Sequence, residues 1–176
     1  MSEKKQLYGR GKTAASGELT HLEGQIVEFP DVDWDSTEPV KPLTSQDTVV
    51  CRWVKNDSGG ALLPGYVATF KAAYYGRYIG AHAASLAIPN GVVDEFLPAA
   101  GVADGKYFWL VQKGPTSVAT TGASNIVQGD VLITGTTAGQ VIEQNPDPAS
   151  ATAAIVQVNA VVGICMATAG TVAGNL

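Results

Sequence analysis

Residues 114–176 contain no Lys, Arg or His, and their only charged side chains are Asp130, Glu143 and Asp147. The segment consists of short runs of Val, Ile, Ala and Thr, separated by turn sequences that contain Gly or Pro. Short β-branched runs between turn signals are typical of strands. The pattern in this third of the chain therefore predicts β-sheet structure. It also lacks the His, Lys, Arg or carboxylate clusters on which acid–base, metal and phosphate chemistry depend.

The same pattern continues through the middle of the chain. Residues 48–56 (TVVCRWVKN) form the clearest strand, because both of their alternating faces are largely apolar, as in a strand covered on two sides. Residues 72–79 are compatible with either a short helix or extended chain. Since turn signals recur at intervals of roughly 8–12 residues, we expect a mainly β fold with a compact β-barrel or β-sandwich body. Further strands are predicted at 24–29, 66–71, 91–96, 106–113, 116–121, 130–134, 140–143 and 160–168.

The first 47 residues differ in composition from the rest. They hold nine of the sixteen acidic and five of the eleven basic residues, and residues 29–42 (FPDVDWDSTEPVKP) carry three prolines. Such a segment buries too little apolar surface to fold alone, and its prolines favour extended backbone. We therefore expect an extended N-terminal arm over 1–47 and a body over 48–176. The arm should lie on its own body or on a neighbouring subunit, and the body should fold without residues 1–23.

Two groups of side chains are candidates for binding a partner. An apolar thread runs through the arm, and it is costly to leave in water. We expect residues 24–29 to pair as an added strand, and the thread to tie the chain to a partner or to another copy. A tyrosine cluster is a possible subunit contact or a platform for sugar stacking. The thread consists of Ile26, Val27, Phe29, Val32 and Trp34, and the cluster of Tyr74, Tyr75 and Tyr78.

No arrangement of residues predicts catalysis. Asp31, Asp33 and Asp35 alternate as in calcium loops, but Pro42 stands where such a loop needs its closing Glu. The adjacent Asp94 and Glu95 would point to opposite faces of a strand and could not easily form an acid–base pair. We expect no catalytic residues, no metal and no cofactor, so the chain is not expected to be an enzyme.

The charge, hydrophobicity and cysteine content of the chain restrict the classes of partner and the cysteine chemistry that we expect. The net charge of −5 and the pI near 4.9 disfavour binding to nucleic-acid phosphates. No apolar run approaches the ~20 residues that span a bilayer, and no secretion signal is visible, so neither membrane nor export is expected. Cys51 and Cys165 lie in apolar runs, which favours buried free thiols.

Three segments resemble the capsid decoration (cement) proteins of tailed bacteriophages. They are residues 54–65 (VKNDSGGALLPG), residues 91–99 (GVVDEFLPA) and residues 108–115 (FWLVQKGP). A late Val-Gly-Ile strand, here Val162 to Ile164, extends the resemblance over about residues 48–168. The resemblance implies a non-enzymatic virion protein, made in the host cytoplasm, that binds the outside of a capsid. Its implied partners are the major capsid protein and itself, as a homotrimer.

Two other functions compete with this expectation. A carbohydrate- or surface-binding β-domain of a phage fibre or cell-surface protein would use the tyrosine cluster. Exposure of those rings in a groove would favour it, whereas their burial between subunits would favour the decoration protein. A hydrolytic enzyme is the third possibility, and the missing catalytic constellation counts against it.

Overall fold

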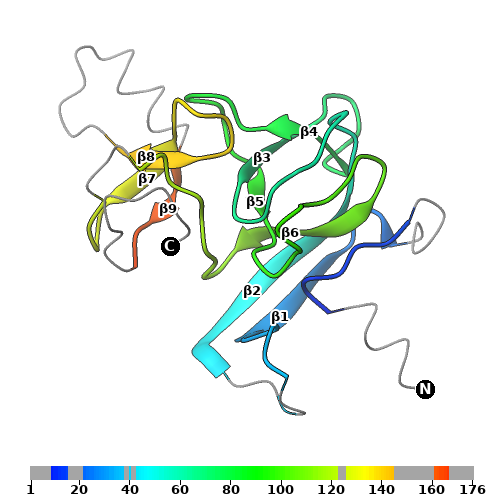
Figure 1. The fold of residues 1–176 in the computed structure, drawn as a ribbon, viewed down its shortest axis with the longest axis horizontal. Helices are drawn as coiled ribbons and strands as arrows, with labels where there is room; N and C mark the ends of the chain where they lie inside the picture. The colour runs from blue at the N-terminus through cyan, green and yellow to red at the C-terminus, as the bar shows by residue number, and fades with distance from the viewer. Residues whose placement is uncertain are drawn as a thin grey trace.

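The computed structural model describes residues 9–15, 22–37, 40, 43–122, 126–144 and 161–166. These residues form nine strands and no α-helix, which confirms the mainly β fold (Figure 1). Within them, no helix is long and apolar enough to cross a membrane. The strands are β1 (Ile26–Val32), β2 (Leu43–Asn56), β3 (Val67–Phe70), β4 (Tyr78–His82), β5 (Gly91–Val93), β6 (Tyr107–Lys113), β7 (Val131–Thr134), β8 (Val141–Glu143) and β9 (Val161–Ile164).

The larger sheet closes on itself. Its order is β1-β2-β4-β3-β5-β6, and β6 also pairs with β2, so β2, β4, β3, β5 and β6 form a ring with β1 attached to β2. The smaller sheet has the order β8-β7-β9 and lies beside one end of the ring (Figure 1). The expected compact β body is thus a small barrel with a three-stranded sheet packed against it.

Aromatic side chains on β2 and β6 fill the centre of the core. Trp53 pairs in register with Trp109, their ring centroids lie 4.8 Å apart, and both side chains are fully buried. Cys51 and Trp53 belong to one apolar cluster, whereas Val54 faces a second cluster on the other side of the strand. The prediction that β2 is covered on both faces is therefore confirmed.

Backbone hydrogen bonds fix the smaller sheet to the barrel. Val67 N donates to Gly139 O, Gly139 N donates to Ala83 O, and Val141 N donates to Ala119 O. Leu132 and Val141 add their side chains to the main apolar cluster. Of the strand predicted at 116–121, the structure has isolated bridge residues at Ala119 and Thr120, and Thr120 pairs with Val141.

The boundary expected between residues 47 and 48 falls inside β2 and is revised. β2 begins at Leu43, and β1 pairs with it antiparallel from Ile26 opposite Arg52 to Val32 opposite Leu43. The physical reason is the alternation in β1, which turns Phe29 into the core of the barrel while Glu28 and Pro30 stay exposed. The part of the expected arm that lies within the described residues is therefore part of the body.

The ambiguous segment is neither a helix nor continuous strand. Residues 71–77 form a tight turn, and the chain becomes extended only at Tyr78, where β4 begins. Ala73 and Tyr75 have positive φ angles of 68° and 50°. Few side chains adopt that conformation, so neither propensity nor hydrophobic pattern predicts the turn.

Candidate functional site

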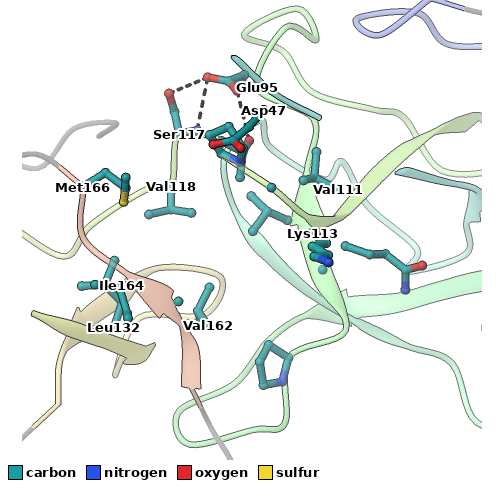
Figure 2. Close-up of a pocket in the computed structure, with 18 of the residues that line it drawn as sticks. Asp47, Glu95, Val111, Lys113, Ser117, Val118, Leu132, Val162, Ile164 and Met166 are labelled. Atoms are coloured by element: carbon teal, nitrogen blue, oxygen red, sulfur yellow. Dashed lines mark hydrogen bonds between the residues drawn. The ribbon is translucent and has the colours of Figure 1, made fainter. Parts of the chain in front are cut away.

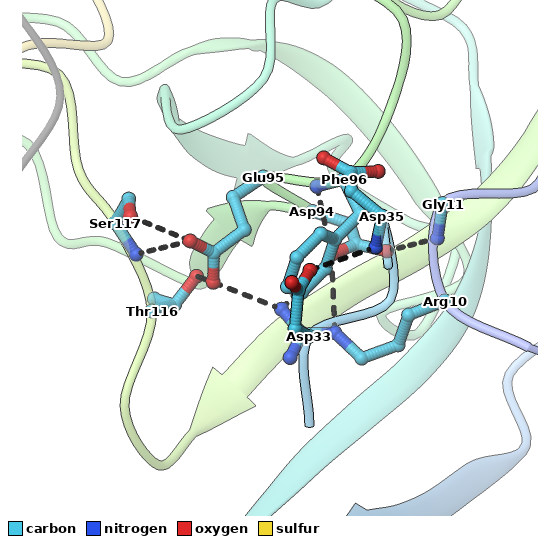
Figure 3. A network of polar contacts seen from close by, with 9 residues as sticks. All are labelled: Arg10, Gly11, Asp33, Asp35, Asp94, Glu95, Phe96, Thr116 and Ser117. Atoms are coloured by element: carbon cyan, nitrogen blue, oxygen red, sulfur yellow. Dashed lines mark hydrogen bonds and ion pairs between the residues drawn. The ribbon is translucent and has the colours of Figure 1, made fainter. Parts of the chain in front are cut away.

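A buried ion pair fixes the segment before β1 to the barrel. Arg10 is 1% exposed, and its guanidinium contacts the buried carboxylate of Asp94 at 2.9 Å and that of Glu95 at 3.3 Å (Figure 3). Gly11 N also donates to Asp94, at 2.6 Å. Burial raises the pKa of Asp94, while Arg10 and Gly11 act in the opposite direction. A body without residues 1–23 would leave Asp94 buried and unpaired, so the expectation that it folds alone is not supported.

Both carboxylates of the 94–95 pair serve this network. β5 ends at Val93, so Asp94 and Glu95 lie in a turn, and strand alternation does not separate them. Glu95 also accepts hydrogen bonds from Thr116 Oγ1, Ser117 N and Ser117 Oγ (Figure 3). The expected strand geometry at residues 94–95 is therefore wrong, because β5 ends before them. The expectation that the two carboxylates form no acid–base pair stays a prediction. Their shared role is to join the N-terminal segment to the loop after β6.

Most of the apolar thread is packed inside the chain itself. Phe29 and Val32 are buried, and the Phe29 ring lies edge-on to both Trp109 and Trp34 at centroid distances of 5.1 and 5.8 Å. Val27 and Trp34 pack against the same cluster. Ile26 differs, because it is 51% exposed at the start of β1. The thread therefore adds to the main apolar cluster of its own chain, and Ile26 is the member whose side chain faces outward.

A cleft of about 1040 Å³ lies between the barrel and the smaller sheet. Figure 2 shows Val111 and Val118 on the barrel side, facing Leu132 and Val162 of the smaller sheet. Polar groups lie at its barrel edge, among them Asp47, Glu95 and Lys113. An open, apolar-floored groove of this size suits an extended polypeptide segment better than a compact small molecule.

Strand β9 forms one wall of this cleft and carries exposed apolar side chains. It pairs with β7, and with no other strand among the described residues. Ile164 is 63% exposed and the neighbouring Met166 is 77% exposed. The loop before β7 continues the pairing on the β7 side of β9, since Gly129 N donates to Cys165 O, and its Val127 is also exposed. An uncharged edge strand with exposed apolar residues is a template for pairing with another chain.

The tyrosine cluster is a stack with its ring faces covered. Tyr74 and Tyr78 lie parallel, 4.6 Å apart, so each covers one face of the other. Lys71 Nζ lies over the Tyr74 ring and Lys55 Nζ over the Tyr78 ring, which places each ammonium on the outer face. Tyr75 stands apart from this stack and is 89% exposed. Sugar stacking needs an open ring face, and Tyr74 and Tyr78 offer little of one.

The groups usually considered for chemistry are structural here. Asp33 accepts hydrogen bonds from Asp35 N and Ser36 N and so closes a turn, and the side chain of Asp31 is buried. In the described part of the chain, no three His, Cys, Asp or Glu side chains are placed to hold a metal. Both cysteines are buried free thiols, as predicted, and burial raises the pKa of Cys51 to about 12. A thiol with that pKa is a poor nucleophile at neutral pH.

Three comparisons with known proteins were negative. No family model, no curated protein sequence and no solved structure matches this chain. The features that bear on its function are the cleft, the β9 edge strand, the turn at residues 71–77 and the resemblance described above for residues 54–65, 91–99 and 108–115.

Proposed function

We propose that this chain is a capsid decoration protein that docks on the outer surface of a phage capsid and also associates with copies of itself, three in the arrangement that the resemblance implies. The observation that carries the docking is β9, an uncharged edge strand whose exposed Ile164 lies beside a groove wide enough for an extended segment. Strand addition gives affinity through main-chain hydrogen bonds, and pockets for alternate side chains give specificity. A capsid protein with an extended segment or a free sheet edge is a partner of this kind.

The rest of the molecule is consistent with a non-catalytic role. The buried charged side chains of Arg10 and Asp94 form an ion pair with each other. The docking surface combines apolar contact with backbone pairing on a three-stranded sheet that is fixed to the barrel. A carbohydrate-binding role is the less supported alternative, because Tyr74 and Tyr78 are stacked on each other under two lysines.

Co-sedimentation with capsids that lack the chain tests this proposal. Ile164→Lys should weaken binding by about 10- to 100-fold, since burying a large aliphatic side chain contributes roughly 1.5–3 kcal/mol. Gly163→Leu is a second test, because a Cβ at Gly163 would meet no atom of the described residues within 4 Å. The fold should tolerate this change, whereas the new side chain would occupy part of the cleft that Gly163 lines and so hinder a segment bound there.

Ile26→Lys serves as the matched control on β1, the strand that is attached to the barrel through β2. Ile26 is exposed on β1, outside the cleft, and the change should leave capsid binding unaltered. If Ile26→Lys abolishes binding while Ile164→Lys does not, the docking surface is β1 and the assignment to β9 is wrong. If the unaltered chain does not sediment with capsids at all, the proposed function fails.

A further inference from the structure

The turn at residues 71–77, called here the Tyr75 turn, holds an aromatic side chain in solvent on a constrained backbone. Positive φ angles at Ala73 and Tyr75 cost free energy and persist only where the surroundings enforce them. Here Arg77 N donates to Tyr74 O at 3.0 Å, and Arg52 Nη1 donates to Gly76 O at 3.3 Å. A rigid, projecting tyrosine is well suited to anchor a protein contact, because little freedom is lost when it binds.

Cations surround the base of the Tyr75 turn. Lys71 pairs with Asp57 and Arg77 pairs with Glu23. Two more cations lie on aromatic rings, Arg52 over Phe70 and Lys55 over Tyr78. Cations thus outnumber carboxylates among these contacts, although the chain as a whole carries a net charge of −5.

Two acidic side chains follow the opposite end of the β1–β2 ladder in the chain. The ladder runs from Ile26 opposite Arg52, near the Tyr75 turn, to Val32 opposite Leu43. Beyond Val32 the chain continues into residues 33–35, the acidic strap, which carries Asp33 and Asp35. Figure 3 places these two side chains beside the Arg10–Asp94 network. The Tyr75 turn precedes β4 and the acidic strap follows β1, so the two charged groups belong to different segments of the fold.

We propose that copies of this chain associate head to tail, with the Tyr75 turn of one copy packed against the acidic strap of the next. Opposite charges at the two ends of one ladder favour a contact between different surfaces over a contact of each surface with itself. Contacts of this heterologous type form a closed ring when the rotation between copies permits it. The inference rests on the self-association included in the proposed function, and it names the two surfaces that form the contact.

Replacing Tyr75 by Asn tests the head of this contact. Asn tolerates a positive φ better than Tyr, so the melting temperature of Tyr75→Asn should equal or exceed that of the unaltered chain. Light scattering should nevertheless show the assembly reduced to single copies. A merely structural role for Tyr75 would not combine preserved stability with lost assembly.

Removing the two strap charges tests the tail. Asp33→Asn with Asp35→Asn keeps a side-chain oxygen to close the turn and removes both negative charges. This double variant alone should also be a single copy. Mixed in equal amounts with Tyr75→Asn, it should form dimers and nothing larger, because each dimer contains one intact head and one intact tail.

Ile88→Ala is the control for loss of an exposed apolar side chain elsewhere, and it should assemble like the unaltered chain. An unaltered chain that is a single copy at micromolar concentration would overturn the inference. So would a strap variant that assembles normally, or a mixture that forms no dimer. Capsid co-sedimentation separates the two proposals: a single-copy chain that still binds capsids refutes only this contact. A head-to-tail assembly that never binds capsids refutes only the docking.

Discussion

At the scale of single residues, Asn56 connects two loops through one buried side chain. Its Nδ2 donates to Gly60 O at 2.8 Å and to Val102 O at 2.7 Å. Its Oδ1 accepts from Ser58 N and from Ser58 Oγ. The residues after Asn56 have the composition of a turn, and the chain bends at 58–60, but the sequence does not reveal that Asn56 also ties this bend to the bridge at Val102. The contact partner is 46 residues away.

Asn56→Ala should lower the free energy of unfolding by about 2–3 kcal/mol, because a fully buried side chain loses its hydrogen bonds to Gly60, Val102 and Ser58. Urea titration measures the change. Gln128→Ala, at an exposed loop position, should change stability by less than about 0.5 kcal/mol. If Asn56→Ala lowers the free energy of unfolding no more than Gln128→Ala does, water takes over the hydrogen bonds of the Asn56 side chain.

His82 should make stability depend on pH. Leu63 N donates to His82 Nε2, which requires the neutral ring, and burial lowers the pKa of His82 below its ordinary value of 6.5. The unfolded chain therefore binds the proton more readily, and this contribution to stability, present above pH 6.5, is lost as the pH falls. The loss cannot exceed about 1.4 kcal/mol per pH unit.

His82→Gln retains an acceptor for Leu63 N and cannot titrate. Between pH 7.5 and 5.5, the unaltered chain should lose more stability than this variant in parallel urea titrations. Equal losses in the two proteins would mean that His82 is protonated as easily in the fold as in the unfolded chain.

At the scale of elements, strands with an apolar pattern could be predicted and contacts made by charges could not. β2, β6, β7 and β8 lie close to where β-branched and aromatic runs predicted them, because side-chain alternation reports local burial. The turn at 71–77 depends on anchoring by Arg52, which the local sequence does not show. The added strand predicted at 24–29 is present as β1, shifted to Ile26–Val32 and paired with β2. Arg10 lies in a polar, glycine-containing segment whose sequence carries no sign that Asp94, 84 residues away, is buried beside it.

Arg10→Met should lower the free energy of unfolding by roughly 3–5 kcal/mol, since it leaves the buried Asp94 carboxylate without its countercharge. Adding Asp94→Asn should recover part of that loss, because the neutral amide oxygen can still accept from Gly11 N. Lys12→Met, two residues along and exposed, is the control and should be nearly neutral. If Arg10→Met unfolds at the same temperature as the unaltered chain, residues 9–15 do not contribute to the stability of the fold.

At the scale of the whole molecule, one apolar core joins the barrel to the smaller sheet, and three outward-facing features remain. The core includes Trp53 and Trp109 of the barrel together with Leu132 of the smaller sheet. The outward features are the β9 edge with its cleft, the Tyr75 turn and the acidic strap. According to the two proposals, the β9 edge binds the capsid, and the Tyr75 turn of one copy binds the acidic strap of another. A decoration protein needs these two kinds of contact on one rigid support.

Hydrogen–deuterium exchange of the full chain, free and on capsids, tests the central claim most directly. In the free chain, outward-facing amides of β9 should exchange rapidly, because β9 pairs only with β7 among the described strands. On capsids, exchange across Val161–Ile164 should slow at least tenfold, while β1 should be unchanged. Protection confined to β1, with β9 exchanging at the same rate in both states, would contradict docking through the β9 edge.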